Sequence, residues 1–295
     1  MFFRQWMSYL SDDAKLTQIV MPGAHNAGSY GMAPTACCQS DNLYRQVVSG
    51  VRHFCLRLDT IGKGIVFSHG ITKGDLFEHA LRDFQKAMED CPTEVFILDL
   101  REYYPQQVGP VTLRYKADPA QVDAILDKYI SPEKYACCDF GHIRDLTIGD
   151  MRKSGKRYIL LNYERAYAYS VDCPNILPWD KKLYGSRPKT FLREIPKIFD
   201  REHTDGIYWF QTQQTPNLGT EIGFVTPKKL NGEITAHYAE LMRAIASDPD
   251  HLRQANVIGG DFMTDGVKCR EIIRLNLDKG LVCEDKREAF LKGLE

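Results

Sequence analysis

The sequence has almost no net charge, because 38 Lys and Arg residues are balanced by 39 Asp and Glu residues and the formal charge is −1. Without a basic excess the chain carries no overall electrostatic attraction to nucleic acid, so we expect no nucleic-acid partner. The sequence also lacks any apolar run close to the ~20 residues that a membrane-spanning helix needs. Charged residues interrupt the opening segment, MFFRQWMSYLSDDAKL, before a hydrophobic signal region can form. We therefore expect a soluble protein without a conventional signal peptide, either cytoplasmic or exported by another route.

The nine cysteines lack the spacing of a metal-binding or redox motif. No CxxC pair is present, and no group of Cys and His has zinc-finger spacing. Two pairs are adjacent in the chain, Cys37-Cys38 and Cys137-Cys138. This pattern favours reduced, partly buried thiols in a reducing compartment, with disulfides in an exported protein as the second interpretation.

Short apolar segments alternate with amphipathic helical patterns along the chain. The strand-like runs are rich in Val, Ile, Phe and Tyr and read LTQIVMPG, GVRHFCLRLD, GIVFSHG, TEVFILDLR, KRYILLNY, GIYWFQTQ and ANVIGGDF. Between them, DLFEHALRDFQKAMED and PAQVDAILDKYI carry apolar residues at helical spacing. The alternation predicts parallel strands joined by crossover helices. We therefore expect one α/β domain over residues 1–295, a barrel with a loop-rich insertion at about 173–206.

Polar residues stand where the expected strands end, which is where a parallel barrel carries its chemistry. These residues are His25 and Asn26, Arg57 and Asp59, His69, Arg101, and Asp261. A neutral His can accept a proton and a protonated His can donate one to a leaving oxygen, while Arg stabilises charge on a phosphate. A carboxylate behind a His fixes its tautomer. The set is suited to breaking a phosphodiester without a metal, although Arg57 and Arg101 can also be explained as partners in structural salt bridges.

Five segments, in order, resemble the blocks of the phosphatidylinositol-specific phospholipase C superfamily. MPGAHNAGSYG resembles its first X-box block, and the later ones are LYRQVVSGVRHFCLRLDT, FSHG, CPTEVFILDLREYY and NVIGGDFM. The Cys38-Gln39 pair is similar to the branch that cleaves glycosyl-phosphatidylinositol (GPI). The resemblance implies a distorted, incompletely closed TIM-type barrel. It also implies cleavage of phosphatidylinositol, or of GPI, to diacylglycerol and inositol 1,2-cyclic phosphate.

The same resemblance implies a role for each strand-end residue. His25 matches the general base that takes the proton of the inositol 2-hydroxyl, and His69 matches the general acid for the leaving oxygen. Arg57 matches the phosphate-binding arginine of metal-independent members, and Asp261 the carboxylate that orients the first His. Arg101 falls where bacterial members place a lysine near the site.

Two departures from the family pattern bear on the catalytic site. Asn26 stands where bacterial secreted members have an aspartate that supports the acid His, and Cys55 replaces another aspartate. Asn26 and Asp59 match calcium-binding positions of the eukaryotic signalling enzymes. However, Arg57 and Arg101 stand where the calcium pattern requires acidic residues, and calcium needs several oxygen ligands. We therefore expect no cofactor, with calcium as the alternative.

Substrate recognition beyond the phosphate is less clearly encoded. Asp59, Arg101, Tyr163, Trp209 and Gln211 are candidates for binding the substrate, and packing in the core is the competing interpretation of Trp209. The expected partner is a membrane phospholipid, phosphatidylinositol or GPI, contacted peripherally by a monomer. The alternatives are a calcium-dependent phospholipase C, a metal-dependent glycerophosphodiesterase on a similar barrel, and a barrel that only binds inositol phospholipids.

Overall fold

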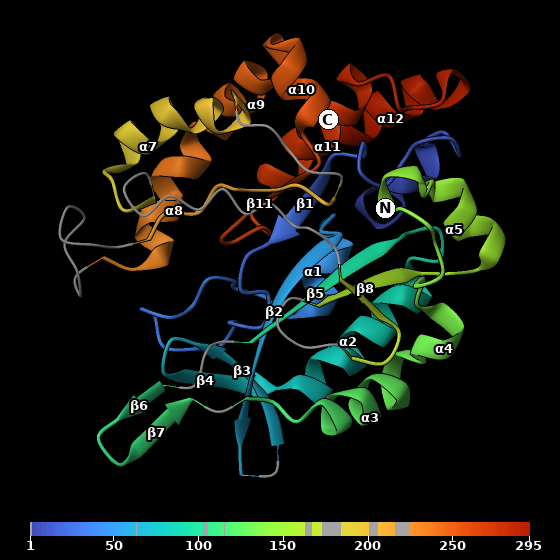
Figure 1. Cartoon of the computed structure of the whole chain (residues 1–295). Helices are drawn as coiled ribbons and strands as arrows, with labels where there is room; N and C mark the ends of the chain where they lie inside the picture. Colours follow the sequence, from blue (N-terminus) through green and yellow to red (C-terminus); the bar gives the residue numbers. More distant parts are fainter. Residues whose placement is uncertain are drawn as a thin grey trace.

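A curled, open sheet of parallel strands forms the centre of the computed structural model (Figure 1). The structure describes residues 2–62, 64–102, 106–114, 116–162, 167–172, 184–200, 206–215 and 225–295. The parallel strands follow the order β10, β11, β1, β2, β5, β8, β9. The strands at the two ends of this order, β10 and β9, do not pair with each other among the described residues. The sheet is therefore a distorted, incompletely closed TIM-type barrel, as the sequence blocks predicted.

The strands have the following bounds: β1 Met21–Ala24, β2 His53–Ile61, β3 Gly64–His69, β4 Thr72–Leu76, β5 Phe96–Glu102, β6 Gln106–Val108, β7 Val111–Arg114, β8 Tyr158–Asn162, β9 Ser170–Asp172, β10 Trp209–Gln211 and β11 Val257–Gly260. The helices are α1 Leu43–Val48, α2 Phe77–Asp90, α3 Pro119–Ile130, α4 Pro132–Tyr135, α5 Ile148–Ser154, α7 Pro188–Glu194, α8 Pro227–Ala236, α9 Tyr238–Ser247, α10 Pro249–Gln254, α11 Lys268–Asp278 and α12 Arg287–Leu294. Short 3-10 turns occupy Phe2–Arg4, Trp6–Tyr9, Ile143–Asp145, Ile195–Asp200 and Glu284–Lys286.

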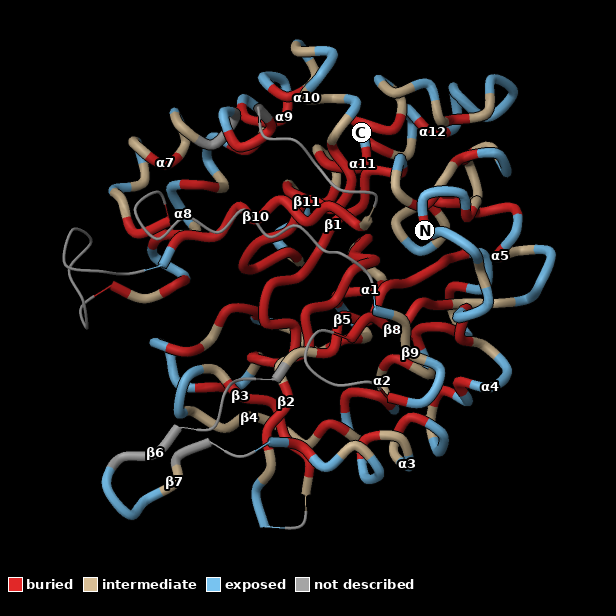
Figure 2. Tube along the Cα trace, in the orientation of Figure 1, coloured by how far each residue is buried: buried red, intermediate tan, exposed pale blue. Residues whose placement is uncertain are grey.

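The two segments that the sequence pattern predicts as helices form α2 and α3. Helix α2 buries its apolar stripe, which consists of Phe77, Ala80, Leu81, Phe84, Ala87 and Met88. Helix α3 begins at Pro119, and the Asp118 side chain accepts a hydrogen bond from the Ala120 amide at 3.2 Å. Strands β1, β8, β10 and β11 are buried along their whole length, as strands covered on both faces should be (Figure 2). No helix in the described part of the chain combines the length and apolar character that crossing a membrane requires.

Two regions differ from the expected pattern. Strand β3 pairs with β2 in the antiparallel sense, and β4 continues this hairpin. Only residues 62 and 63 separate β2 from β3, whereas a parallel crossover needs a dozen or more residues. Gly62, with φ of 58°, allows the tight turn. In the expected insertion at 173–206, the described residues 184–200 contain α7 and a 3-10 turn rather than loops alone.

Candidate active site

The sheet register places the predicted residues on one face of the barrel. Ala24 is level with Gly260, so His25 and Asp261 follow neighbouring strand ends. The amide of His25 continues the ladder by donating to the Gly260 carbonyl at 3.0 Å. On the next pair, Arg57 of β2 is level with Arg101 of β5. Since side chains alternate along a strand and matched positions share a face, these residues converge on the same side of the sheet.

His25 lies between a carboxylate and a guanidinium. Its Nδ1 is 2.8 Å from Oδ1 of Asp261, and its Nε2 is 3.2 Å from Nη2 of Arg57. Because a guanidinium can only donate, Nε2 accepts and the ring proton belongs on Nδ1, where it is donated to Asp261. This tautomer leaves a lone pair on Nε2, which is what a general base needs.

Burial controls the charge of this pair. Desolvation holds the pKa of His25 well below its usual value, and the positive charges of Arg57 and Arg101 lower it further. The imidazole is therefore neutral near pH 7. Desolvation also raises the pKa of Asp261 to about 7. A neutral imidazole in contact with a carboxyl group that titrates near neutrality is well placed to accept a proton.

His69, at the end of β3, faces His25 across the site. The two ring centroids are 6.4 Å apart and the rings are nearly perpendicular, at 86°. Nδ1 of His69 lies 2.7 Å from the Ala36 carbonyl oxygen, so it carries the proton in the neutral ring and Nε2 is the other titrating nitrogen. Burial lowers the pKa of His69. The Ala36 carbonyl, from the loop before α1, thus orients the second imidazole.

Asn26 does not support His69 directly. Its Nδ2 lies 3.6 Å from Sγ of Cys38, and Sγ in turn lies 3.7 Å from Nδ1 of His69. Asn26 adopts a left-handed backbone with φ of 45°, which Asn tolerates better than most residues. Its Oδ1 is buried without a hydrogen-bond partner among the described residues. Sequence reasoning missed Ala36 and gave Cys38 no role in the site, because no local pattern marks a backbone carbonyl or a lone thiol as a neighbour of a distant His.

Gln39 joins the loop to the strand ends. Its Nε2 donates to the carbonyls of His25 at 2.8 Å and Gly260 at 3.0 Å, and its Oε1 accepts from the Met263 amide at 3.1 Å. The side chain is fully buried. The sequence marked Gln39 only through its similarity to the GPI-cleaving branch. In the structure, its three hydrogen bonds tie the loop before α1 to the segments that carry His25 and Asp261 and so fix the distance between those segments.

The two arginines have different surroundings. Arg57 contacts His25, whereas Arg101 forms a bidentate pair with Asp99, with Nε donating to Oδ1 at 3.1 Å and Nη2 donating to Oδ2 at 2.8 Å. Burial of Asp99 opposes its ionisation, but Arg101 and His53 outweigh that effect and hold the Asp99 pKa below its usual value. The structural salt bridge that the sequence left open as an explanation is thus found for Arg101. Its position is nevertheless on the same face of the sheet as Arg57.

The remaining sequence candidates are less available. Asp59 is buried and paired with Lys73, and it also accepts from the Thr60 amide at 2.7 Å. Trp209 is fully buried, its ring centroid 6.3 Å from that of His25 and 4.8 Å from the Arg101 guanidinium carbon, so it forms part of the core beneath the site. Gln211 is buried, and its Oε1 accepts from Gln213. Tyr163 lies outside the described residues.

The donor set does not fit a calcium ion. Asp59 is engaged by an ammonium group, and the guanidinium of Arg57 stands against the first imidazole. Calcium requires six to eight oxygen ligands, whereas the matching positions present cations. Of the two residues that match calcium-binding positions, Asn26 and Asp59, only Asn26 has a side-chain oxygen without a hydrogen-bond partner within the described segments.

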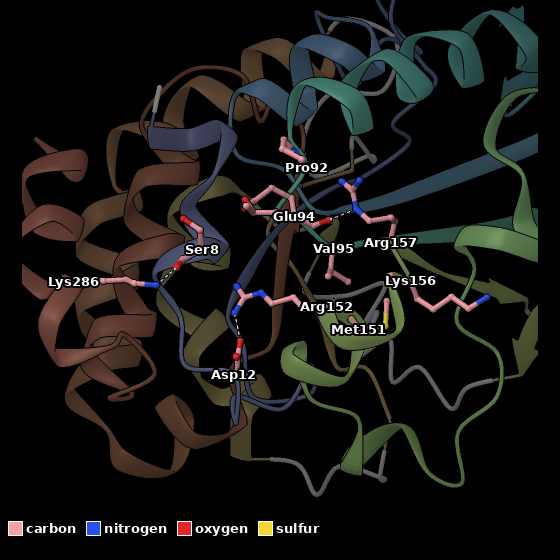
Figure 3. Close-up of a pocket in the computed structure, with 12 residues that line it drawn as sticks. Ser8, Asp12, Pro92, Glu94, Val95, Met151, Arg152, Lys156, Arg157 and Lys286 are labelled. Atoms are coloured by element: carbon pink, nitrogen blue, oxygen red, sulfur yellow. Dashed lines mark hydrogen bonds and ion pairs between the residues drawn. The ribbon is translucent and has the colours of Figure 1, made fainter.

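A separate cavity of about 480 Å³ lies at the amino ends of β5 and β8 (Figure 3). Its cationic side chains already bind protein oxygens: Arg152 pairs with Asp12, and Lys286 donates to the Ser8 carbonyl at 2.8 Å. Arg157 likewise donates to backbone carbonyls. Because this cavity is at the opposite edge of the sheet from His25, it is a structural cleft and not part of the candidate active site.

Solved structures share this architecture. The phosphatidylinositol-specific phospholipase C of Listeria monocytogenes matches with a TM-score of 0.64 and 17% identity, over 93% of this chain and 98% of that one. A pentafluoro-Phe form of the Staphylococcus aureus enzyme matches with a TM-score of 0.65 and 16% identity, over 92% and 97%. No protein-family model and no curated protein sequence matches the chain. The chain therefore has the fold of the bacterial phosphatidylinositol-specific phospholipases C, as the sequence blocks predicted.

Proposed function

We propose that this protein cleaves phosphatidylinositol, or its glycosylated form GPI, to diacylglycerol and inositol 1,2-cyclic phosphate. The observation that carries the proposal is the placement of His25, whose Nδ1 is held by Asp261 while Nε2 faces Arg57. His69 stands opposite at a ring separation of 6.4 Å. A base, an acid and a phosphate-binding cation are thus within reach of one phosphodiester.

The proposed reaction uses two proton transfers. Nε2 of His25 takes the proton of the inositol 2-hydroxyl, and that oxygen attacks phosphorus while the bond to the diacylglycerol oxygen breaks. His69, protonated at Nε2, gives its proton to the leaving oxygen. Arg57 stabilises the charge on the non-bridging oxygens. Burial lowers the pKa of His69, and the negative charge of a bound phosphodiester opposes that shift, which favours the protonated acid only when substrate is present.

We propose that no metal takes part in this chemistry. The support is electrostatic, because Arg57 places positive charge where a cation would otherwise be needed and Lys73 neutralises Asp59. In this proposal Arg57 supplies the charge stabilisation that a divalent ion provides in other phosphodiesterases.

The protein reaches its lipid, in this proposal, through apolar hairpin tips beside the site. Ile61, Ile71 and Val111 are three of the five large exposed hydrophobic residues in the described segments, at 54%, 61% and 54% exposure. Ile61 lies at the β2–β3 turn and Val111 in the β6–β7 hairpin, which both extend from the sheet (Figure 1), whereas Ile71 lies at the other end of β3, in the β3–β4 turn beside His69. Apolar residues at such positions can enter the headgroup region of a bilayer while the site faces it. One of the compared structures concerns membrane binding by the Staphylococcus aureus enzyme.

The proposed activity is tested with phosphatidylinositol vesicles in excess EDTA. Release of inositol phosphate is measured for the wild type, His25→Ala and the control His79→Ala, and ³¹P NMR identifies the five-membered cyclic phosphate. His79 lies on α2, half exposed and paired with Asp75, so its loss should leave activity unchanged. We expect EDTA-resistant activity that His25→Ala abolishes.

Two outcomes would contradict the proposal. Activity lost in EDTA and restored by calcium would favour the calcium-dependent alternative. Absence of cleavage of either lipid, together with retained vesicle binding, would favour a barrel that only binds inositol phospholipids.

A further inference from the structure

Three potential metal ligands from separate segments of the chain lie close together, and the imidazole of His25 is one of them. A ring nitrogen of His25, Sγ of Cys38 and a carboxylate oxygen of Asp261 lie within 4.8 Å of one another. His25 follows β1, Cys38 belongs to the loop before α1, and Asp261 follows β11. All three side chains are buried, and Cys38 is a free thiol. Within the part of the chain that the structure describes, this is the one group of its kind.

We propose that this cluster is an inhibitory binding site for a thiophilic divalent cation, with Zn²⁺ as the representative ion. Imidazole nitrogen, thiolate sulfur and carboxylate oxygen form a ligand set typical of zinc, whereas magnesium and calcium select oxygen and avoid sulfur. The ligand set of this cluster therefore differs from the all-oxygen set that calcium needs.

The spacing suits closure around a small ion. Zinc binds nitrogen at about 2.0 Å and sulfur at about 2.3 Å, so ligand atoms in a tetrahedral site lie roughly 3.5 Å apart. His25 and Asp261 are in contact at 2.8 Å and would have to separate slightly to admit the ion, while Cys38 would have to approach.

Asn26 gives an independent indication of a missing ligand. Its amide lies against Cys38, with Nδ2 3.6 Å from Sγ, and its Oδ1 is buried without a hydrogen-bond partner in the described segments. Native proteins pair nearly all buried polar atoms, so the lone carbonyl oxygen of a side chain whose amide contacts Cys38 calls for an explanation. A bound cation, reached directly or through a coordinated water, would satisfy it.

Occupancy of the cluster would remove the base of the proposed reaction. Nε2 of His25 faces the Arg57 guanidinium, so Nδ1, on the side of Asp261, is the nitrogen that would bind the ion. If Nδ1 binds, the ring proton must reside on Nε2, which then cannot accept the proton of a hydroxyl. The inhibition rests on the proposed function, but binding of the ion does not.

Binding also releases a proton. A thiol carries its proton near neutral pH, and the metal displaces that proton. The S–H bond breaks, the S–Zn bond forms and the proton leaves to solvent.

The test measures metal binding first. Metal-free protein is titrated with ZnCl₂ by calorimetry, and with CoCl₂ as a spectroscopic probe whose thiolate-to-cobalt charge-transfer band reports a sulfur ligand. The variant is Cys38→Ser, and the matched control is Cys37→Ser, which removes the adjacent half-buried thiol outside the cluster. We expect one ion per chain and a charge-transfer band in the wild type and in Cys37→Ser. Cys38→Ser should lose the band and weaken zinc binding by about 100-fold or more, since even changes around a metal's direct ligands cost roughly 10–100-fold.

A measurement on the unaltered chain guards against a variant that fails to fold. X-ray absorption at the zinc edge should show one sulfur ligand and two or three nitrogen or oxygen ligands in the wild type. A shell without sulfur, no binding to the wild type, or equal binding by a folded Cys38→Ser variant would overturn the proposal.

The inhibition is measured separately with phosphatidylinositol vesicles. Zinc should suppress cleavage by the wild type and by Cys37→Ser in a way that EDTA reverses. Cleavage that stays unchanged when the site is shown to be filled would overturn the inhibitory role. If the protein cleaves neither lipid, the proposed function fails while the calorimetric and spectroscopic results still decide whether the ion binds.

Discussion

Nη2 of Arg57 lies 3.2 Å from Nε2 of His25, so the candidate phosphate-binding cation and the candidate base are in contact. The contact has two effects on the imidazole. It directs the lone pair of Nε2 toward the position of a phosphate, and it adds a positive charge that, after burial, lowers the pKa of His25. A substrate phosphate that binds Arg57 therefore brings its neighbouring hydroxyl to the basic nitrogen.

Removal of the charge behind His25 should inactivate the protein. In Asp261→Asn the new amide can donate to Nδ1, which would move the ring proton to Nε2 and abolish the base. We expect kcat to fall by about 10³–10⁴-fold, the size of effect seen when a His in a catalytic triad is held in the wrong tautomer. Initial-rate assays on phosphatidylinositol vesicles measure this, with Asp250→Asn, an exposed residue of α10, as the control. A loss of less than tenfold would contradict the role assigned to Asp261.

Asp261→Asn should also change how the stability of the protein depends on pH. Although it lowers activity, the variant should become more stable than the wild type as pH rises. The pKa of Asp261 is raised from 3.8 to about 7 by burial, so its contribution to stability is fully present below pH 3.8 and is lost as pH rises through 7. Because an Asn side chain does not ionise, Asp261→Asn removes this loss of stability at higher pH. Relative to the wild type, the variant should gain about 2–4 kcal/mol of unfolding free energy between pH 4 and pH 8. Urea unfolding of both proteins across this range measures the difference, and a constant difference would contradict the raised pKa.

The Arg101–Asp99 pair should be important for stability. Asp99 is fully buried, and Arg101→Gln would leave its carboxylate without the bidentate partner. Breaking one side of a buried pair costs about 3–5 kcal/mol, whereas replacing both sides costs less. We expect Arg101→Gln to lower the unfolding free energy by about this amount and Arg101→Gln/Asp99→Asn to recover at least half of it. Equal destabilisation of the single and double variants in chemical unfolding would refute the pairing.

Charge on the hairpin tips should weaken contact with lipid. The triple variant Ile61→Glu/Ile71→Glu/Val111→Glu replaces three exposed apolar side chains, and Leu291→Glu on α12 is the matched control. Each apolar side chain that enters the headgroup region contributes up to about 1.5–3 kcal/mol, so vesicle affinity should fall by about tenfold or more in the triple variant only. Sedimentation with phosphatidylinositol vesicles measures the affinity. An equal loss in both variants would place the contact surface elsewhere.

Much of this protein can be predicted from short stretches of sequence. The apolar runs of β1, β5 and β8 and the stripe of α2 are local periodicities, which depend on residues within one or two turns of each other. For the same reason His25, Arg57, His69 and Asp261 could be named as a candidate site, since each stands within or directly after a recognisable strand.

The tertiary structure alone decided which groups those residues contact. The Ala36 carbonyl and the Cys38 thiol at His69, and Lys73 at Asp59, carry no local signature, and neither does the use of Arg101 to hold Asp99. The antiparallel return of β3 likewise depends on a two-residue turn and not on the apolar pattern of the strand. Periodicity within a segment determines whether it forms a helix or a strand. The contact between His25 and Asp261, 236 residues apart in the chain, depends on how the whole sheet curls and pairs.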